Sequence, residues 1–176
     1  MAAPRKVGLK VRIRKASLSD LPILVAHRRA MWRDIHAFTP AELDQGDRTY
    51  GKWLRKHLVA GEATAFIAET ASHKAVASGA IFARELDPVP GEVEYRVLHI
   101  ISMFTEEPYR GQGIASKIVK ELVNWARSSR YPPVVTLSPG TKEVMEFYEK
   151  AGFKRFWMMK MGLKGRAPRS RGRQNH

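Results

Sequence analysis

The segment from residue 93 to residue 128 constrains the fold most. It begins with "VEYRVLHIISMFT" (93–105), which is apolar at most positions, as is typical of a central strand covered on both faces. A proline-containing bend and the turn Arg110-Gly111-Gln112-Gly113 follow. From Gly113 to about Ser128 the apolar residues recur at helical spacing. A strand that passes through a glycine turn into an amphipathic helix predicts an α/β domain.

The rest of the chain supplies further elements of both kinds. Alternation and turn residues predict strands in 11–17, 63–71, 74–85 and 134–138, and one or two closing strands in 153–163. Apolar stripes predict helices from about residue 20 to 35, from Pro40 to Val59, and from Pro139 to a stop at Gly152. The order predicts one domain around a mixed sheet.

Composition narrows the classes of protein. The 176 residues fit a single domain, and they include no apolar run long enough to span a membrane and no secretory signal pattern. Cysteine is absent, which excludes disulfides and thiolate chemistry and fits a reducing compartment, so we expect a cytoplasmic protein. The six histidines are scattered without metal-ligand spacing, so no metal site is expected.

The positive charge is concentrated at the two ends. Of 31 lysines and arginines, six lie in residues 1–15 and five in 162–176, and neither stretch contains an acidic residue. The C-terminal stretch has almost nothing to bury, so we expect it to be disordered. It is either a solubilising tail or an arm for RNA, the ribosome or another polyanion.

The glycine turn has the features of an anion-binding site. Free N–H groups and the helix dipole favour an anion at a helix N-terminus, glycines allow close approach, and Arg110 adds a cation. An ordinary tight turn is the alternative. The spacing of a P-loop is absent, and the dinucleotide fingerprint is only partly met, because the next strand ends in Ser138-Pro139 without the acidic residue that would hold a ribose.

The hexamer Arg110-Gly111-Gln112-Gly113-Ile114-Ala115 resembles the [Q/R]-x-x-G-x-[G/A] segment of the GNAT superfamily of acetyl-CoA-dependent N-acetyltransferases. About thirty residues later "VMEFYEKAGF" (144–153) resembles the "FYEKxGF" segment of that family. The resemblance covers residues 11–161 and implies an α/β fold of α+β type. It implies a central mixed, mostly antiparallel sheet with a splayed parallel strand pair and about four helices. Residues 1–10 and 162–176 are then basic extensions.

The resemblance implies where acetyl-CoA binds. The two splayed strands map onto 103–105 and 135–137, and the pyrophosphate onto 110–116. Ser138 is a further candidate for the cofactor arm, with capping of the next helix as its alternative. The implied cofactor-binding residues are Met103, Phe104, Thr105, Arg110, Gly111, Gln112, Gly113, Ile114, Ala115, Ser116 and Ser138.

Tyr148 occupies the position of the family's tyrosine and is the predicted general acid for the CoA thiolate; the alternative is aromatic packing with Phe147 and Phe153. The general base is less determined by the sequence. Glu94 is favoured by position, acting directly or through water. The other candidates are Glu92, His99, Asp34 and His36.

The resemblance implies that the acceptor is a primary amine, of a small molecule or of a peptide or protein. In "HRRAMWRDIHAF" (27–38) the aromatic residues could wall a pocket and the arginines could meet an acidic substrate; alternatively they are core and a solvated helix face. Homodimers are common in the family. The rival interpretation is an RNA- or ribosome-associated binding protein that uses the basic termini.

Overall fold

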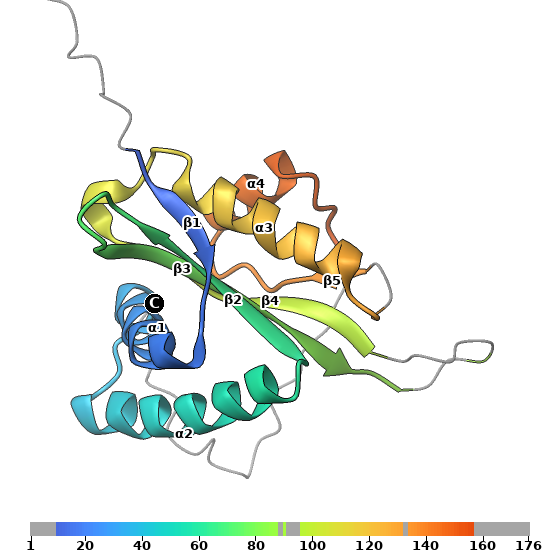
Figure 1. The fold of residues 1–176 in the computed structure, drawn as a ribbon, viewed down its shortest axis with the longest axis horizontal. Helices are drawn as coiled ribbons and strands as arrows, with labels where there is room; N and C mark the ends of the chain where they lie inside the picture. Colours follow the sequence, from blue (N-terminus) through green and yellow to red (C-terminus); the bar gives the residue numbers. More distant parts are fainter. Residues whose placement is uncertain (1–9, 88–89, 91–95, 132–133, 157–176) are drawn as a thin grey trace, which may run out of the picture.

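The computed structural model describes residues 10–87, 90, 96–131 and 134–156. A twisted sheet forms the middle layer, with α1 and α2 against one face and α3 and α4 on the other (Figure 1). The helices are α1 (Leu21–Ile35), α2 (Pro40–Val59), α3 (Ile114–Ser128) and α4 (Lys142–Lys150), with 3-10 turns η1 (Leu18–Asp20) and η2 (Glu107–Tyr109). The strands are β1 (Arg12–Lys15), β2 (Ala63–Glu69), β3 (Ala75–Glu85), β4 (Arg96–Thr105) and β5 (Val135–Thr136).

The five strands lie in the order in which they occur in the chain. The first four are antiparallel neighbours, and β5 pairs with β4 in parallel. A mixed, mostly antiparallel sheet with one parallel pair and four helices confirms the predicted fold class. In the described part of the chain, no helix is long and apolar enough to cross a membrane.

Local signals start α2 where the sequence predicts it. Thr39 and Glu42 form a reciprocal capping box at the start of α2, and Pro40 occupies its first turn. The predicted hairpin is also confirmed, because β2 and β3 are joined by a short turn in which Thr70 N–H donates to the carbonyl of Lys74 at 3.0 Å.

Two predictions about the last elements are wrong. The helix predicted over "TKEVMEFYEKAG" (141–152) is present as α4, but Pro139 does not start it. The helix begins at Lys142, because the side chain of Thr141 accepts a hydrogen bond from the N–H of Val144 and caps it. The strand predicted over 134–138 contains only Val135 and Thr136, both half-buried rather than buried. Residues 153–156 form no strand, and the remainder of the predicted closing strands lies outside the described residues.

Apolar side chains fill both faces of the sheet. Leu98 and Ile100 of β4 pack with Ile118 and Leu122 of α3 on one face. On the other face Leu24 of α1 packs in a cluster with residues of α2, β2 and β3, and half-buried Ile101 of β4 borders it. The central strand is therefore packed on both sides, as its apolar run predicts.

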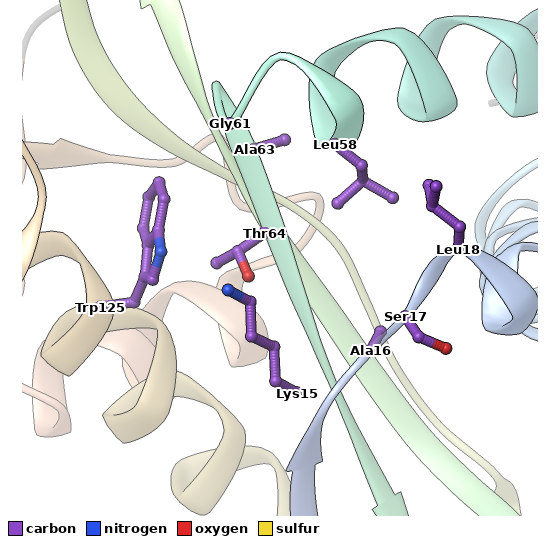
Figure 2. A pocket seen from close by; sticks show the side chains of 9 residues that line it. All are labelled: Lys15, Ala16, Ser17, Leu18, Leu58, Gly61, Ala63, Thr64 and Trp125. Atoms are coloured by element: carbon purple, nitrogen blue, oxygen red, sulfur yellow. The ribbon is translucent and has the colours of Figure 1, made fainter.

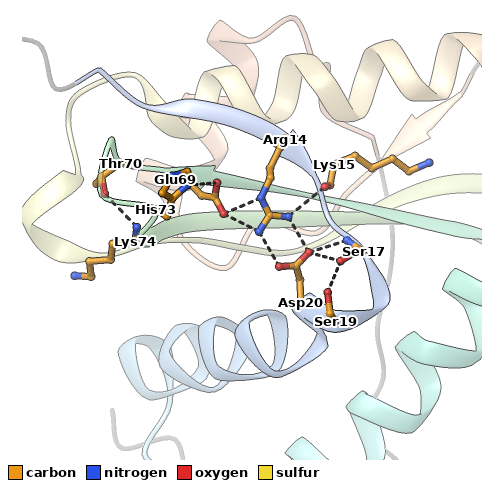
Figure 3. Close-up of polar contacts among 9 residues, drawn as sticks. All are labelled: Arg14, Lys15, Ser17, Ser19, Asp20, Glu69, Thr70, His73 and Lys74. Atoms are coloured by element: carbon orange, nitrogen blue, oxygen red, sulfur yellow. Dashed lines mark hydrogen bonds and ion pairs between the residues drawn. The ribbon is translucent and has the colours of Figure 1, made fainter.

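A charged cluster joins β1, β2 and the start of α1 (Figure 3). Arg14 donates to Asp20 and to Glu69, each at 2.7 Å, and Asp20 also accepts from the Ser17 N–H at 2.8 Å. The Asp20 side chain is only 9% exposed. Hydrogen bonds from Arg14 hold the pKa of Asp20 well below its usual value. This cluster fixes the first helix on the sheet.

Candidate functional site

The site is built around an open edge of β4. Its pairing with β5 ends at His99, opposite Thr136, whereas β4 continues to Thr105. Within the described residues, β5 offers no partner to residues 100–105. This splay leaves main-chain groups of β4 available to an extended ligand, and it lies beside the predicted residues Met103, Phe104 and Thr105.

A bulge changes the direction of β4 within this open segment. Ala80 pairs with Ile101, but Ser78 pairs with Phe104, so β4 has one extra residue opposite Gly79. Ser102 has φ of +54°, which is unusual for a residue with a side chain. Met103 packs over Gly79 toward Ile118 of α3.

The glycine turn presents unpaired backbone donors. Gly111 and Gly113 have φ of 72° and 74°, values that glycine adopts without strain. Lys117 N–H makes the first bond of the helix, to the carbonyl of Gly113, and within the described chain no acceptor faces the N–H groups of residues 114–116. The first turn of α3 contains no acidic residue. The turn can therefore hold an anion.

The side chain of Arg110 forms hydrogen bonds with two other residues of the chain. Its guanidinium donates to the Thr105 carbonyl at 2.9 Å and to the Asp34 carboxylate at 2.5 Å. Both side chains are about half exposed. The contact ties the glycine turn to the last turn of α1, and an anion at the turn would have to share Arg110 with Asp34.

Tyr148 lies on the α3 side of the sheet. Its ring is 5.0 Å from Phe147 and 5.5 Å from Phe153, and Phe153 packs on the core cluster that includes Val135. The ring is only 6% exposed, and burial raises the pKa of Tyr148 above its ordinary value. The side chain therefore keeps its proton at neutral pH.

Ser138 is exposed, two residues beyond the end of β5. The alternative that it caps the following helix is wrong, since Thr141 is the cap. A contact with a cofactor arm stays a prediction.

The candidate bases differ in their surroundings. Glu92 and Glu94 lie outside the described residues. Asp34 is bound to Arg110, and His36 lies in an aromatic cluster, 5.5 Å from the rings of Trp32 and Phe38. Of the described candidates, His99 is the one the structure places where β4 and β5 separate.

His99 is oriented by β5. Its Nδ1 lies 2.8 Å from Oγ1 of Thr136, which in turn lies 3.4 Å from the Leu98 carbonyl. If Thr136 donates to that carbonyl, it accepts from Nδ1–H of His99, and the lone pair is left on Nε2. Burial lowers the pKa of His99, and Arg84 lowers it further, so the ring is neutral at neutral pH.

Sequence reasoning missed two residues beside the open edge. Tyr50 of α2 is buried, and its side chain lies next to Ser102 of β4. The contact falls outside hydrogen-bond geometry, so the buried Oγ of Ser102 has no partner among the described residues. Arg28 of α1 lies over the Tyr50 ring, 4.2 Å from its centroid. The only sequence signal was a serine within an apolar strand.

Two surface hollows lie elsewhere. One opens where β1 leaves the edge of β2, with Trp125 and Lys15 on one side and Leu58 and Leu18 on the other (Figure 2). It is at the opposite edge of the sheet from β5 and contains none of the predicted site residues. The other lies at the bend between α1 and α2 and is lined by Arg29, Arg33, His36, Ala37, Phe38, Pro40 and Leu43. Among the residues that the structure describes, no three acidic or histidine side chains are grouped to hold a metal ion.

Comparison with known proteins agrees with this geometry. Residues 28–153 match the family model described as "Acetyltransferase (GNAT) family". A predicted acetyltransferase from Clostridium acetobutylicum, solved with acetyl-CoA, is similar at 25% identity with a TM-score of 0.74, covering 86% of this chain and 96% of its own.

Two further solved structures share the fold. A GCN5-related N-acetyltransferase from Ralstonia eutropha JMP134 has a TM-score of 0.75 at 18% identity, covering 89% of this chain and 100% of its own. The aminoglycoside N-acetyltransferase AAC(6')-Iy, in complex with CoA, has a TM-score of 0.66 at 19% identity over 93% of this chain and 99% of its own. A search among curated proteins finds no match.

Proposed function

The chain belongs to the acetyltransferase (GNAT) family, and from this premise we propose that it transfers an acetyl group from acetyl-CoA to a primary amine by direct attack. Family membership makes it an acyltransferase that depends on acetyl-CoA. The observation that carries the proposal is the conjunction of an open β4 edge with the glycine turn that follows it. Each of these features suits a different part of one extended ligand.

The residues present fit acetyl-CoA. The free amides of 114–116 and the two glycines with positive φ would bind the pyrophosphate. Met103, Phe104 and Thr105 have no partner from β5, and their main-chain groups on that side would bind the amide-containing arm along β4. The Thr105 carbonyl already accepts from Arg110, and Ser138 lies beyond the facing strand. Acetyl-CoA supplies an activated acetyl thioester, whose carbonyl carbon is open to attack by an amine.

Tyr148 is our general acid. Its raised pKa means that the hydroxyl is protonated throughout the neutral range, although it is a weaker acid than an exposed tyrosine. It therefore acts first as a hydrogen-bond donor to the sulfur and gives up its proton as negative charge develops there. Within the described residues, no side chain competes for this hydroxyl.

The general base that removes a proton from the amine is Glu94 or His99. Glu94 is favoured by its position in the sequence before β4, and it would remove the proton directly or through a water molecule. His99 is supported by its place at the splay and by its neutral ring, which leaves one nitrogen free to accept a proton. A base of either kind is weak, which suits an amine of low pKa better than a lysine side chain, of which only about one in a thousand is neutral near pH 7.4.

Titration calorimetry with acetyl-CoA tests the proposal, with desulfo-CoA and NADH as controls. Micromolar binding of acetyl-CoA and desulfo-CoA without binding of NADH is expected. Release of free thiol in the presence of amines would then report turnover. Absence of binding to every CoA species would overturn the transferase proposal.

Three finer parts of the proposal rest on the sequence alone. We place the activity in the cytoplasm because the sequence contains no cysteine, which fits a reducing compartment. Contact with a polyanion would use the basic ends, of which residues 1–9 and 162–176 lie outside the described residues. A homodimer is proposed from the family resemblance only. Removing residues 162–176 separates the rival binding role: polyanion binding should vanish while acetyl-CoA binding persists.

A further inference from the structure

Arg28 differs from the other half-buried arginines of the described chain. Arg14 binds Asp20 and Glu69, Arg29 binds Asp44 and Asp47, and Arg96 lies 3.8 Å from Glu62. Arg28 makes no ion pair and no hydrogen bond with any residue that the structure describes. Its neighbours are the faces of two aromatic rings, Tyr50 at 4.2 Å and Trp32 at 5.4 Å.

Stacking fixes the Arg28 guanidinium but leaves its hydrogen-bonding edge free. A guanidinium has five N–H donors in its plane, and contact with a ring face uses none of them. Asp47 attracts Arg28 electrostatically, but its carboxylate is bound by Arg29 at 2.6 Å. A half-buried cation without a partner is costly unless a ligand completes its hydrogen bonds.

The position of Arg28 relates it to the open edge of β4. The Tyr50 ring beneath Arg28 also lies beside Ser102, where the bulge falls. The buried hydroxyl oxygen of Ser102 lacks a hydrogen-bond partner among the described residues. Among the described residues, Arg28 thus has no ion-pair partner and the Ser102 hydroxyl has no hydrogen-bond partner, and both lie beside Tyr50.

We propose that Arg28, with Tyr50 and Ser102, binds an anionic group on the amine acceptor, so that the acceptor is a small amine bearing a carboxylate or a phosphate. This inference rests on the proposed transferase function. It disfavours polycationic acceptors, because a half-buried arginine that no described carboxylate pairs with would repel them. Arg29 is already paired, and exposed Arg33 lies at the bend, so neither fills the same role.

Matched amines test the inference by calorimetry on the full chain, with and without CoA. The pairs are 4-aminobutyrate against butylamine and phosphoethanolamine against ethanolamine, with spermidine as a polycation. We expect at least one acid-bearing member to bind tenfold or more tightly than its neutral twin, and the pair that does so identifies carboxylate or phosphate. Equal binding within both pairs, or tighter binding of spermidine, would overturn the inference.

Variants locate the anion. Arg28→Met keeps most of the apolar stem and should abolish the preference, whereas Arg28→Lys should keep part of it. Arg33→Met, on the same helix, is the matched control and should leave the preference intact. Loss of the preference in Arg33→Met instead would place the anion at the α1–α2 bend and refute the assignment to Arg28.

The experiments distinguish failure of the transferase proposal from failure of the anionic-acceptor proposal. Acetyl-CoA binding without acid preference removes only the anionic acceptor. Acid preference that depends on Arg28, in a chain that binds no CoA species, removes the transferase and leaves the anion site. If Arg28→Met does not fold, the wild-type pairs and Arg28→Lys still decide.

Discussion

A Cβ atom placed on Gly79 would overlap Sδ of Met103 and would lie 3.0 Å from Cγ2 of Ile118. Because Gly79 of β3 has no side chain, the side chain of Met103, in the bulged part of β4, can pack directly over it. The absence of a side chain on one strand permits the altered geometry of its neighbour, and that geometry lies in the segment expected to bind the cofactor arm.

Replacing Gly79 by alanine should therefore destabilise the protein by about 1–3 kcal/mol, as overpacking of a filled core does. It should also weaken acetyl-CoA binding, because β4 must shift at the bulge. Denaturant unfolding and calorimetry measure the two effects. Met103→Ala in the same chain should restore part of the stability, and lack of any rescue would show that the crowding comes from elsewhere.

Gly113→Ala should weaken acetyl-CoA binding by strain rather than by collision. A Cβ there meets no atom within 4 Å, but the φ of 74° costs a side chain about 1–2 kcal/mol. Gly140 also has open space around it but no positive φ, so Gly140→Ala is the matched control. Equal loss of affinity in both variants would count against a special role for the turn.

Tyr148→Phe should lower turnover about a hundredfold and leave the dissociation constant of acetyl-CoA nearly unchanged. The reason is that phenylalanine retains the packing against Phe153 and removes only the hydroxyl. Stopped-flow release of thiol and calorimetry separate the two quantities. Phe147→Leu serves as a packing control. Unchanged turnover in Tyr148→Phe would assign the ring to the core alone.

If His99 is the base, kcat/KM should fall as the pH drops through the lowered pKa of the imidazole, that is, below its ordinary value of about 6.5. The neutral form is active, so activity persists at higher pH. His99→Gln should remove this limb and reduce kcat/KM by roughly 10²–10⁴. Glu94→Gln is the parallel test, and a larger loss there with an unaltered limb in His99→Gln would assign the base to Glu94.

Asp20→Asn should cost on the order of 2 kcal/mol, because it removes one of the two carboxylates that bind half-buried Arg14, while Glu69 remains as the other. The pKa of Asp20 is lowered in the folded state, so its contribution is complete above the unfolded value of about 3.9 and is lost as the pH falls below it. The variant should therefore flatten the acid limb of the stability curve. Asp44→Asn, a more exposed carboxylate paired with Arg29, should change stability by less than about 1 kcal/mol.

Elements that depend on neighbouring residues in the chain can be predicted from the sequence. Thr39 and Pro40 define the start of α2 within a few residues of chain, so that helix was predictable. Pro139 was a poor guide to the start of α4. A proline is compatible with the first turn of a helix but does not cap it, whereas Thr141 makes the capping hydrogen bond. The bulge at Ser102 depends on Gly79 across the sheet, and the Tyr50 ring against which Arg28 stacks comes from another helix. Contacts between distant segments leave little trace in single-sequence patterns.

Because the β4–β5 pairing ends early, ligand binding and hydrogen exchange should both report whether the open edge of β4 has a hydrogen-bonding partner. Amides of β4 beyond His99 lack a partner from β5 on that side, and the sheet is completed only when another chain of polar groups lies along it. Acetyl-CoA should therefore slow deuterium uptake in residues 100–105 and raise the melting temperature together. Bound acetyl-CoA would then act as a temporary strand, and the protein would be more stable in its complex with the cosubstrate than alone.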